Sequence, residues 1–176
     1  MTLDIPTPEP FTATHQLASI AQLLDIEDLR LARAREATRA GKDVILDRTV
    51  DTLLAHGHAV GRMNDFDCDA AARHLVASRH VAIPDLTIVL TADPDVVEHR
   101  ASLRDNMPTI FYDRDFSEHF NAYFTQSLAP IVVPLDTTDS SLADLTACAL
   151  TYIDQYRTTL GRSARDPGTH PAQDAS

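Results

Sequence analysis

The pattern of apolar and polar positions divides the chain into helical stretches and short apolar runs. In several stretches apolar residues recur three or four positions apart, the spacing of one helix face. The expected helices begin at about Thr14 and Glu27, cover 50–60, 69–79 and 94–103, and continue over 116–128 and 142–156. Gly41 is expected to end the second helix. Asp93-Pro94 is expected to open the helix at 94–103.

Three short apolar runs lie between the helical stretches and predict strands at 44–46, 86–90 and 131–133. Each run is almost continuously apolar, so both faces of each strand should be buried, as in a parallel sheet between helices. The expected fold class is therefore α/β, with three layers around a parallel sheet. Ligands bind such sheets beyond the carboxyl ends of the strands, and the first such end here is Asp47-Arg48.

Length and composition narrow the functional classes. The 176 residues suit one domain, expected over 1–160, and the polar segment 161–176 is expected to be a disordered tail. A net charge of −11 argues against a nucleic-acid binder. Two cysteines without a C-x-x-C pair predict neither a zinc site nor a disulfide framework, and no apolar run is long enough for a membrane span. A cytoplasmic protein is expected.

Three segments, in order, resemble the thymidylate kinase family of P-loop kinases. The first is 44–48, which ends in Asp-Arg and is followed by Thr-Leu-Leu-Ala-His and Gly-Arg. The second is 84–100, with Pro-Asp-Leu before the predicted strand and Asp-Pro-Asp after it. The third is 113–124, which opens with Asp-Arg-Asp-Phe. Pro8-Glu9-Pro10 is similar to the Glu-Pro that follows the second strand of the family. The resemblance covers roughly 8–157.

The resemblance implies ATP-dependent phosphoryl transfer to a nucleoside or nucleoside monophosphate, with ATP and Mg²⁺ as cofactors and room for a homodimer. Such enzymes mainly position groups and neutralise charge on the transferred phosphoryl. It implies catalytic roles for Asp47 and Arg48, the former as base or magnesium ligand and the latter as a fork for phosphate oxygens. The implied substrate-binding residues are Glu9, Arg48, His56 and Arg62, and the implied lid over the ATP phosphates carries Arg100, Arg104 and Arg114. Arg30 or Arg33 is a further candidate for substrate phosphate.

The chain departs from the family at the phosphate loop, G-x-x-x-x-G-K-[S/T]. Its only Gly-Lys pair is Gly41-Lys42, which Asp43 follows. We therefore expect the P-loop kinase fold without its first strand, phosphate loop and first helix, which would lie upstream of Met1. His56-Gly57 replaces the Tyr-Gln with which the family reads thymine. The alternatives are a catalytically silent relative that binds a nucleotide or protein partner, and a kinase of another small molecule.

Overall fold

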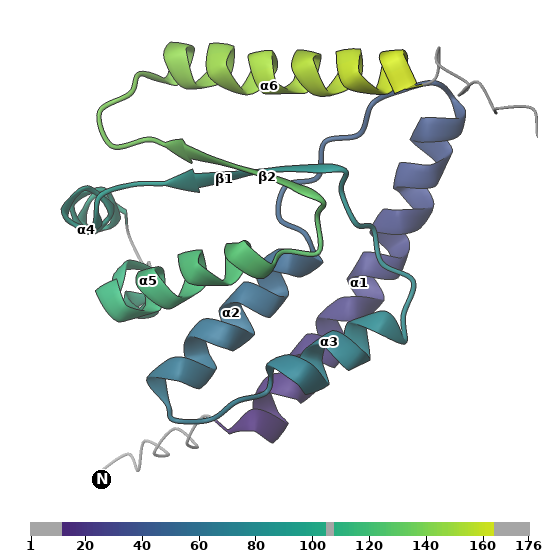
Figure 1. The fold of residues 1–176 in the computed structure, drawn as a ribbon. Coiled ribbons are helices and arrows are strands. Elements are labelled where there is room, and N and C mark those ends of the chain that lie inside the picture. The colour runs from purple at the N-terminus through teal and green to yellow at the C-terminus, as the bar shows by residue number, and fades with distance from the viewer. Residues whose placement is uncertain (1–11, 105–107, 164–176) are drawn as a thin grey trace, which may run out of the picture.

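The computed structural model describes residues 12–104 and 108–163. Figure 1 shows the arrangement of the elements. In chain order they are α1 (Ala13–Arg39), α2 (Val50–Met63), α3 (Asp69–Ala77), β1 (Leu86–Thr91), α4 (Pro94–Ser102), the 3₁₀ helix η1 (Thr109–Tyr112), α5 (Arg114–Tyr123), the 3₁₀ helix η2 (Phe124–Gln126), β2 (Ile131–Asp136) and α6 (Leu142–Ser163).

Several helices begin where a short polar side chain can satisfy a free backbone N–H. The Asp93 carboxylate accepts a hydrogen bond from the N–H of Asp95, and Pro94 follows at the first helical position, which confirms the predicted start of α4. Asp113 caps α5 in the same way, by accepting from the N–H of Phe116 at 3.0 Å. These caps place the two helices that join β1 to β2.

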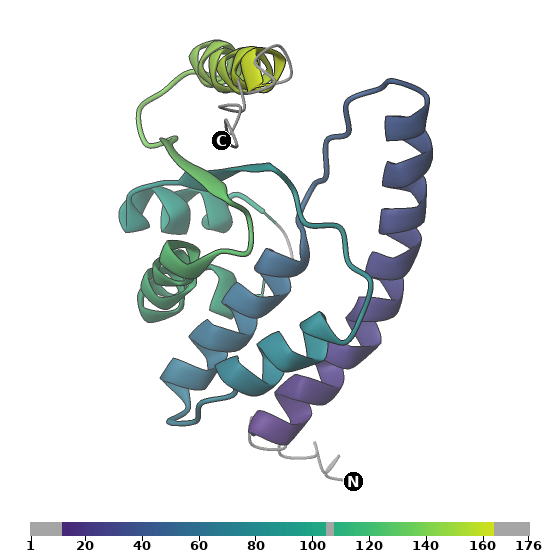
Figure 2. The ribbon, with the colours of Figure 1, turned by 45° about the vertical axis from the view of Figure 1, so that its right-hand side comes forward.

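The first helix is one continuous element, where the sequence pattern predicted two. α1 runs for 27 residues from Ala13 to Arg39, past the expected break near Glu27. It ends as predicted at Gly41, whose φ of 72° suits a residue without a Cβ. Figure 2 shows that α1 forms one long side of the molecule, with α2 and α3 packed along its lower half.

The main core lies among the helices and not at the sheet. Ile20 and Leu24 of α1 pack with Leu54 of α2, Val76 of α3 and Tyr123 of α5, all nearly or fully buried. A second cluster joins α2 to Phe116 of α5. Apolar burial, the main source of folding free energy, is therefore concentrated where α2 meets its neighbours.

A buried carboxylate fastens α2 to the segment after α5. Asp51 has no exposed surface, and its oxygens accept hydrogen bonds from the hydroxyls of Tyr123 and Ser127, both at 2.7 Å. The N–H of Leu128 donates to the same carboxylate at 2.9 Å. Burial and this carboxylate raise the pKa of Tyr123 above its ordinary value. Every oxygen is thus satisfied, as a buried polar group requires.

The sheet is small and corrects the predicted fold class. Within the described residues it has two strands, β1 and β2, paired in parallel with Leu86 opposite Ile131 and Thr91 opposite Asp136. α6 lies over one face and α5 over the other (Figure 1). The described residues are 65% helical and hold only two strands, so the expected three-layer parallel sheet of the P-loop kinase type is wrong. The other two predicted strands are confirmed at their expected positions.

The missing third strand is the run at 44–46, which has no regular secondary structure and no ladder partner among the described residues. Val44 is 37% exposed and Ile45 is 88% exposed, so the expected burial on two faces does not occur. A strand needs a neighbour for its backbone N–H and C=O groups, and this segment has none among the described strands. An apolar run therefore proved insufficient to predict a sheet position.

Candidate functional site

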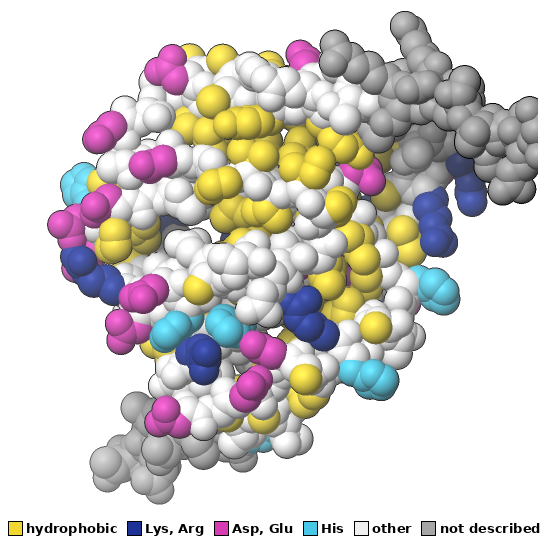
Figure 3. Space-filling view, viewed as in Figure 1, with side chains coloured by type: hydrophobic (Ala, Val, Ile, Leu, Met, Phe, Trp, Pro, Cys, Tyr) yellow, Lys and Arg dark blue, Asp and Glu magenta, His cyan; other side chains and the backbone are white. Residues whose placement is uncertain are grey.

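A large groove separates the unpaired segment from the sheet. It has a volume of about 2700 Å³ and is bounded by 42–49 on one side and by β1 on the other. α1, α2 and α5 line it on one face, and Leu150, Ile153 and Tyr156 of α6 line it on the opposite face. In Figure 3 hydrophobic side chains gather between α6 and the strands, in the middle of this view of the molecule.

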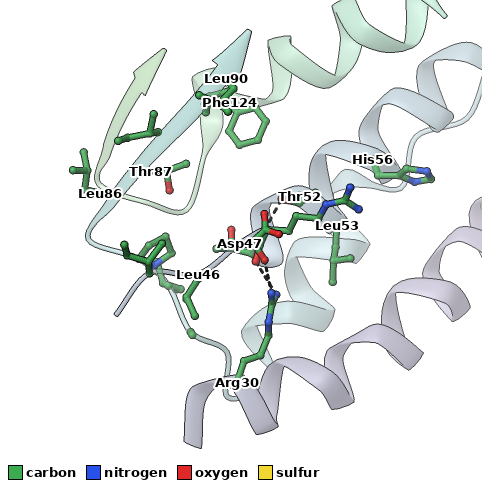
Figure 4. A pocket seen from close by; sticks show the side chains of 18 of the residues that line it. Arg30, Leu46, Asp47, Thr52, Leu53, His56, Leu86, Thr87, Leu90 and Phe124 are labelled. Carbon is green, nitrogen blue, oxygen red and sulfur yellow. Dashed lines mark hydrogen bonds between the residues drawn. The ribbon is translucent and has the colours of Figure 1, made fainter. Parts of the chain in front are cut away.

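Arg30 fixes the end of the 42–49 segment. Its guanidinium donates to the backbone carbonyl oxygen of Arg48 at 2.7 Å and to that of Asp47, and Figure 4 shows it reaching from α1 to this turn. It also donates to the Glu27 carboxylate at 2.8 Å. The planar fork of arginine suits two adjacent acceptors, so α1 determines where the Asp47-Arg48 turn lies.

The turn itself has an unusual backbone. Arg48 has a φ of 58°, in the left-handed region that costs a residue with a Cβ roughly 1–2 kcal/mol. The capping box of α2, in which the Thr52 hydroxyl accepts from the N–H of Thr49, follows immediately. The strained residue is therefore held between a helix start and the Arg30 clamp. Asp47 and Arg48 both line the groove with exposed side chains.

The groove is cationic relative to the chain. Among the described residues eight Lys and Arg line it against six Asp and Glu, whereas the whole chain has 15 against 26. Arg104 and Arg114 are among the eight. A local excess of positive charge in a concave surface attracts anions even when the net charge is negative.

His56 lines the same groove from α2. Its ring lies edge-on to Phe116, with centroids 5.5 Å apart, and its Nδ1 is 3.4 Å from Nε2 of Gln16. Burial lowers the pKa of His56 below its ordinary value. A neutral imidazole on an aromatic wall can stack or hydrogen-bond with an uncharged ring, which is compatible with a nucleoside base.

The structure brings together some of the residues expected from sequence and separates others. Asp47, Arg48, His56, Arg104 and Arg114 all line the groove. They come from the 42–49 segment, from α2, from the segment after α4 and from the start of α5.

The remaining expected site residues lie elsewhere. Arg100 does not line the groove; its guanidinium donates to Thr137 Oγ1 at 3.0 Å and to the Thr137 carbonyl at 2.7 Å, which ties α4 to the end of β2. Arg62 is exposed at the far end of α2, outside the groove lining. The expected lid is thus divided, and Arg114 also forms an ion pair with Asp95. Glu9 lies outside the described residues.

Sequence reasoning missed two acidic residues that organise this region. Glu27 is 3% exposed and supports Arg30, and Asp51 is the buried acceptor between α2 and α5. Glu27 lies among charged residues of α1, so the sequence pattern indicates an exposed acid and not a buried one. Asp51 lies in the first turn of α2, where acids are common, so its sequence position gave no sign of its burial.

The described residues contain neither a metal-binding cluster nor a candidate membrane span. No three His, Cys, Asp or Glu side chains in 12–104 and 108–163 gather in a way that could hold a metal ion. None of the helices there combines the length and apolar character that crossing a membrane requires.

Comparison with known proteins identifies no relative of this chain. No protein-family model matches the chain, and no curated protein is similar enough to count as a relative. Functional inference therefore rests on the groove and on the residues that line it.

Proposed function

We propose that the groove binds a nucleoside or nucleotide, and that it is the acceptor site of an ATP-dependent phosphoryl transfer whose phosphate loop the 176 residues do not contain. The observation that supports this most is the double hydrogen bond from Arg30 to the carbonyls of Asp47 and Arg48. Arg30 holds the turn through backbone carbonyls, so the Asp47 and Arg48 side chains line the groove without a hydrogen-bonded or ion-paired side chain among the described residues.

The two side chains have complementary roles in such a reaction. The Asp47 carboxylate can accept the proton of an acceptor hydroxyl, and the Arg48 guanidinium can pair with phosphate oxygens. Arg104 and Arg114 add positive charge on the same surface. Positioning and charge neutralisation are the main contributions a protein makes to phosphoryl transfer.

Magnesium fits this residue set without a protein cage. Mg²⁺ bound with nucleotide phosphates uses one or two carboxylates and keeps several waters. Asp47, exposed at the groove, is the carboxylate that would hold it, and the ion would supply charge neutralisation on the phosphates. The proton-accepting and phosphate-pairing roles remain with the side chains of the chain itself.

A second function, binding without transfer, is favoured by one specific observation. The 176 residues contain no G-x-x-x-x-G-K-[S/T] loop, whose backbone N–H groups and lysine hold the β- and γ-phosphates of ATP. Under this alternative the groove still binds a nucleoside or nucleotide, but as a sensor or partner-binding site. Ligand binding and turnover must therefore be measured separately.

Calorimetric titration with a panel of nucleosides and nucleoside monophosphates, with and without Mg²⁺, tests the binding. We expect at least one to bind, and Arg48→Ala to weaken binding of the monophosphate by roughly 10- to 150-fold, because a hydrogen bond to a charged group contributes about 1.5–3 kcal/mol. Arg79→Ala is the matched control, since Arg79 pairs with Asp25 away from the groove. Absence of binding at millimolar ligand, or equal effects of both substitutions, would refute the proposal.

A further inference from the structure

The groove between β1 and the 42–49 segment has the shape of a vacant strand position. β1 pairs with β2 along one edge, and its other edge pairs with no strand among the described residues. The 42–49 segment, on the opposite side of the groove, belongs to no strand, and its hydrogen bonds at Asp47, Arg48 and Thr49 go to α1 and α2 and not to a strand. Free backbone N–H and C=O groups on an exposed edge form a template for pairing with another extended chain.

The faces of this position are apolar on both sides. Leu53, Phe120 and Phe124 line one face, and Leu150, Ile153 and Tyr156 of α6 line the other. Figure 4 shows Phe124 beside the exposed side chain of Leu90 on β1, and Leu53 further along the groove on α2. A strand placed between two apolar faces must itself be apolar on both sides, as strands inside parallel sheets are.

Two buried polar atoms on the groove residues have no partner. Glu27 Oε2 and Thr87 Oγ1 are inaccessible to solvent and make no hydrogen bond to the described residues. Thr87 belongs to β1 and Glu27 to α1, and both line the groove. Unpaired buried oxygens cost about 1–3 kcal/mol each, so the residues around the groove are not fully satisfied by the described chain alone.

The size of the groove favours a polypeptide over a small molecule alone. Small-molecule pockets have volumes of roughly 300–1000 Å³, and this groove has about 2700 Å³. β1 is six residues long, about 20 Å at the rise of a strand. A strand of five or six residues would occupy the length of β1 and leave the Asp47-Arg48 end open for a ligand.

The parts of the chain outside the described residues do not have the composition of such a strand. Segment 1–11 contains three prolines, and segment 164–176 contains two prolines with few large apolar side chains. Proline cannot donate to a ladder. The cationic balance of the groove also disfavours a basic occupant.

We propose that this groove accepts, by β-strand addition, a five- or six-residue apolar segment of another polypeptide that pairs with the free edge of β1. Main-chain hydrogen bonds supply most of the affinity in this mode of recognition, so binding tolerates changes of side chain. The proposal is independent of nucleotide binding, because it concerns the sheet edge and not the Asp47-Arg48 turn.

A synthetic peptide tests this with the whole 176-residue chain. The probe is Glu-Lys-Val-Ile-Val-Ile-Val-Lys-Glu, whose flanking side chains carry no net charge, and the control probe replaces both isoleucines with proline, which removes ladder donors at equal charge. Fluorescence anisotropy measures affinity, and hydrogen exchange measures protection of the backbone amides of 86–91 and 43–46. We expect saturable binding of the first peptide, at least tenfold weaker binding of the second, and slower exchange at both segments.

Two protein variants distinguish strand addition from general adhesion of apolar peptides. Ile45→Lys places a charge on the groove wall and should weaken binding of the first peptide at least tenfold; Ile45 is 88% exposed, so folding should be unaffected. Leu142→Lys, at an 81% exposed residue outside the groove lining, should leave binding unchanged. No binding, equal binding of both peptides, unchanged exchange in 86–91, or equal effects of the two variants would overturn the proposal.

Discussion

The hydroxyl of Tyr123 donates a 2.7 Å hydrogen bond to the carboxylate of Asp51, 72 residues earlier in the chain, and both residues are buried. The bond joins α5 to α2, and the hydroxyl of Ser127 and the N–H of Leu128 converge on the same carboxylate. Asp51 is therefore the polar centre of the contact between these helices. It holds α5, and with it one face of the groove, against the helical core.

Asp51→Ala should lower the free energy of unfolding by at least about 3 kcal/mol, because it leaves two hydroxyls and a backbone N–H buried without an acceptor. Tyr123→Phe removes a single donor and should cost about 1–1.5 kcal/mol. Urea denaturation of both variants measures the difference. If Asp51→Ala lies within 1 kcal/mol of the parent, the carboxylate does not organise this contact.

Arg48→Gly should separate binding from stability. Glycine adopts the φ of 58° without strain, and its greater freedom in the unfolded chain roughly offsets that gain, so the free energy of unfolding should change by less than about 1 kcal/mol. Monophosphate binding should nevertheless fall at least tenfold, because the guanidinium is lost. Asp65→Gly, at a φ of 55° outside the groove lining, is the control and should leave binding unchanged. Equal titration curves for all three proteins would contradict the assignment of Arg48.

His56 should make stability depend on pH below neutrality. Burial lowers its pKa in the folded state, so below the unfolded value of about 6.5 the unfolded chain binds more protons. The contribution of His56 is therefore fully present above about pH 6.5 and is lost as the pH falls towards the lower folded pKa. The difference in unfolding free energy between the parent and His56→Phe, measured from pH 5 to 8, should shift in favour of the variant at acidic pH. A difference that stays constant across this range would show that the histidine is not desolvated.

The 176-residue chain, assayed alone with ATP and Mg²⁺, should show no turnover in the ordinary kinase range of about 1 s⁻¹ or above. The reason is the absence from its sequence of a loop that holds the β- and γ-phosphates. A coupled assay for ADP release over a panel of nucleosides and monophosphates measures this. Turnover at 1 s⁻¹ with any acceptor would show that other groups, such as Arg104 and Arg114, hold the phosphates instead.

The glycines of α2 should differ in their tolerance of alanine. A Cβ on Gly61 would lie 2.6 Å from the backbone oxygen of Phe66, whereas one on Gly57 would lie 3.2 Å from Cδ1 of Ile20, a side-chain atom that can move. Gly61→Ala should therefore destabilise by about 1–3 kcal/mol despite the better helix propensity of alanine, and Gly57→Ala should stay within about 1 kcal/mol of the parent. Thermal unfolding of the pair measures the contrast, and the reverse order would contradict it.

The sequence predicted local elements better than their assembly. The Asp93-Pro94 helix start, the end of α1 at Gly41 and the strands β1 and β2 were confirmed because each depends on residues close in the chain. The predicted strand at 44–46 was wrong because pairing depends on a neighbour that the apolar pattern cannot reveal. The predicted fold class was wrong for the same reason.

The candidate site was predicted in part. Asp47, Arg48 and His56 were expected from local motifs, and the structure places all three on one groove. Arg30 donates to the backbone carbonyls of Asp47 and Arg48, which lie 17 and 18 positions later in the chain. Every residue has a backbone carbonyl, so the sequence could not reveal this contact. Arg100 was expected to face phosphates, but it donates to Thr137, a contact that only the return of the chain at β2 creates.

The acceptor at Asp51 has a consequence for synthesis of the protein. Its donors are encoded 72 to 78 residues later, so α1, α2 and α3 emerge from the ribosome before any of them exists. At roughly 5–20 residues per second, that interval lasts about 4–15 s. Throughout it the nascent helices carry a carboxylate at the centre of an apolar surface with only water to solvate it. The helical half of the molecule can therefore complete its packing only after residue 129 has been translated.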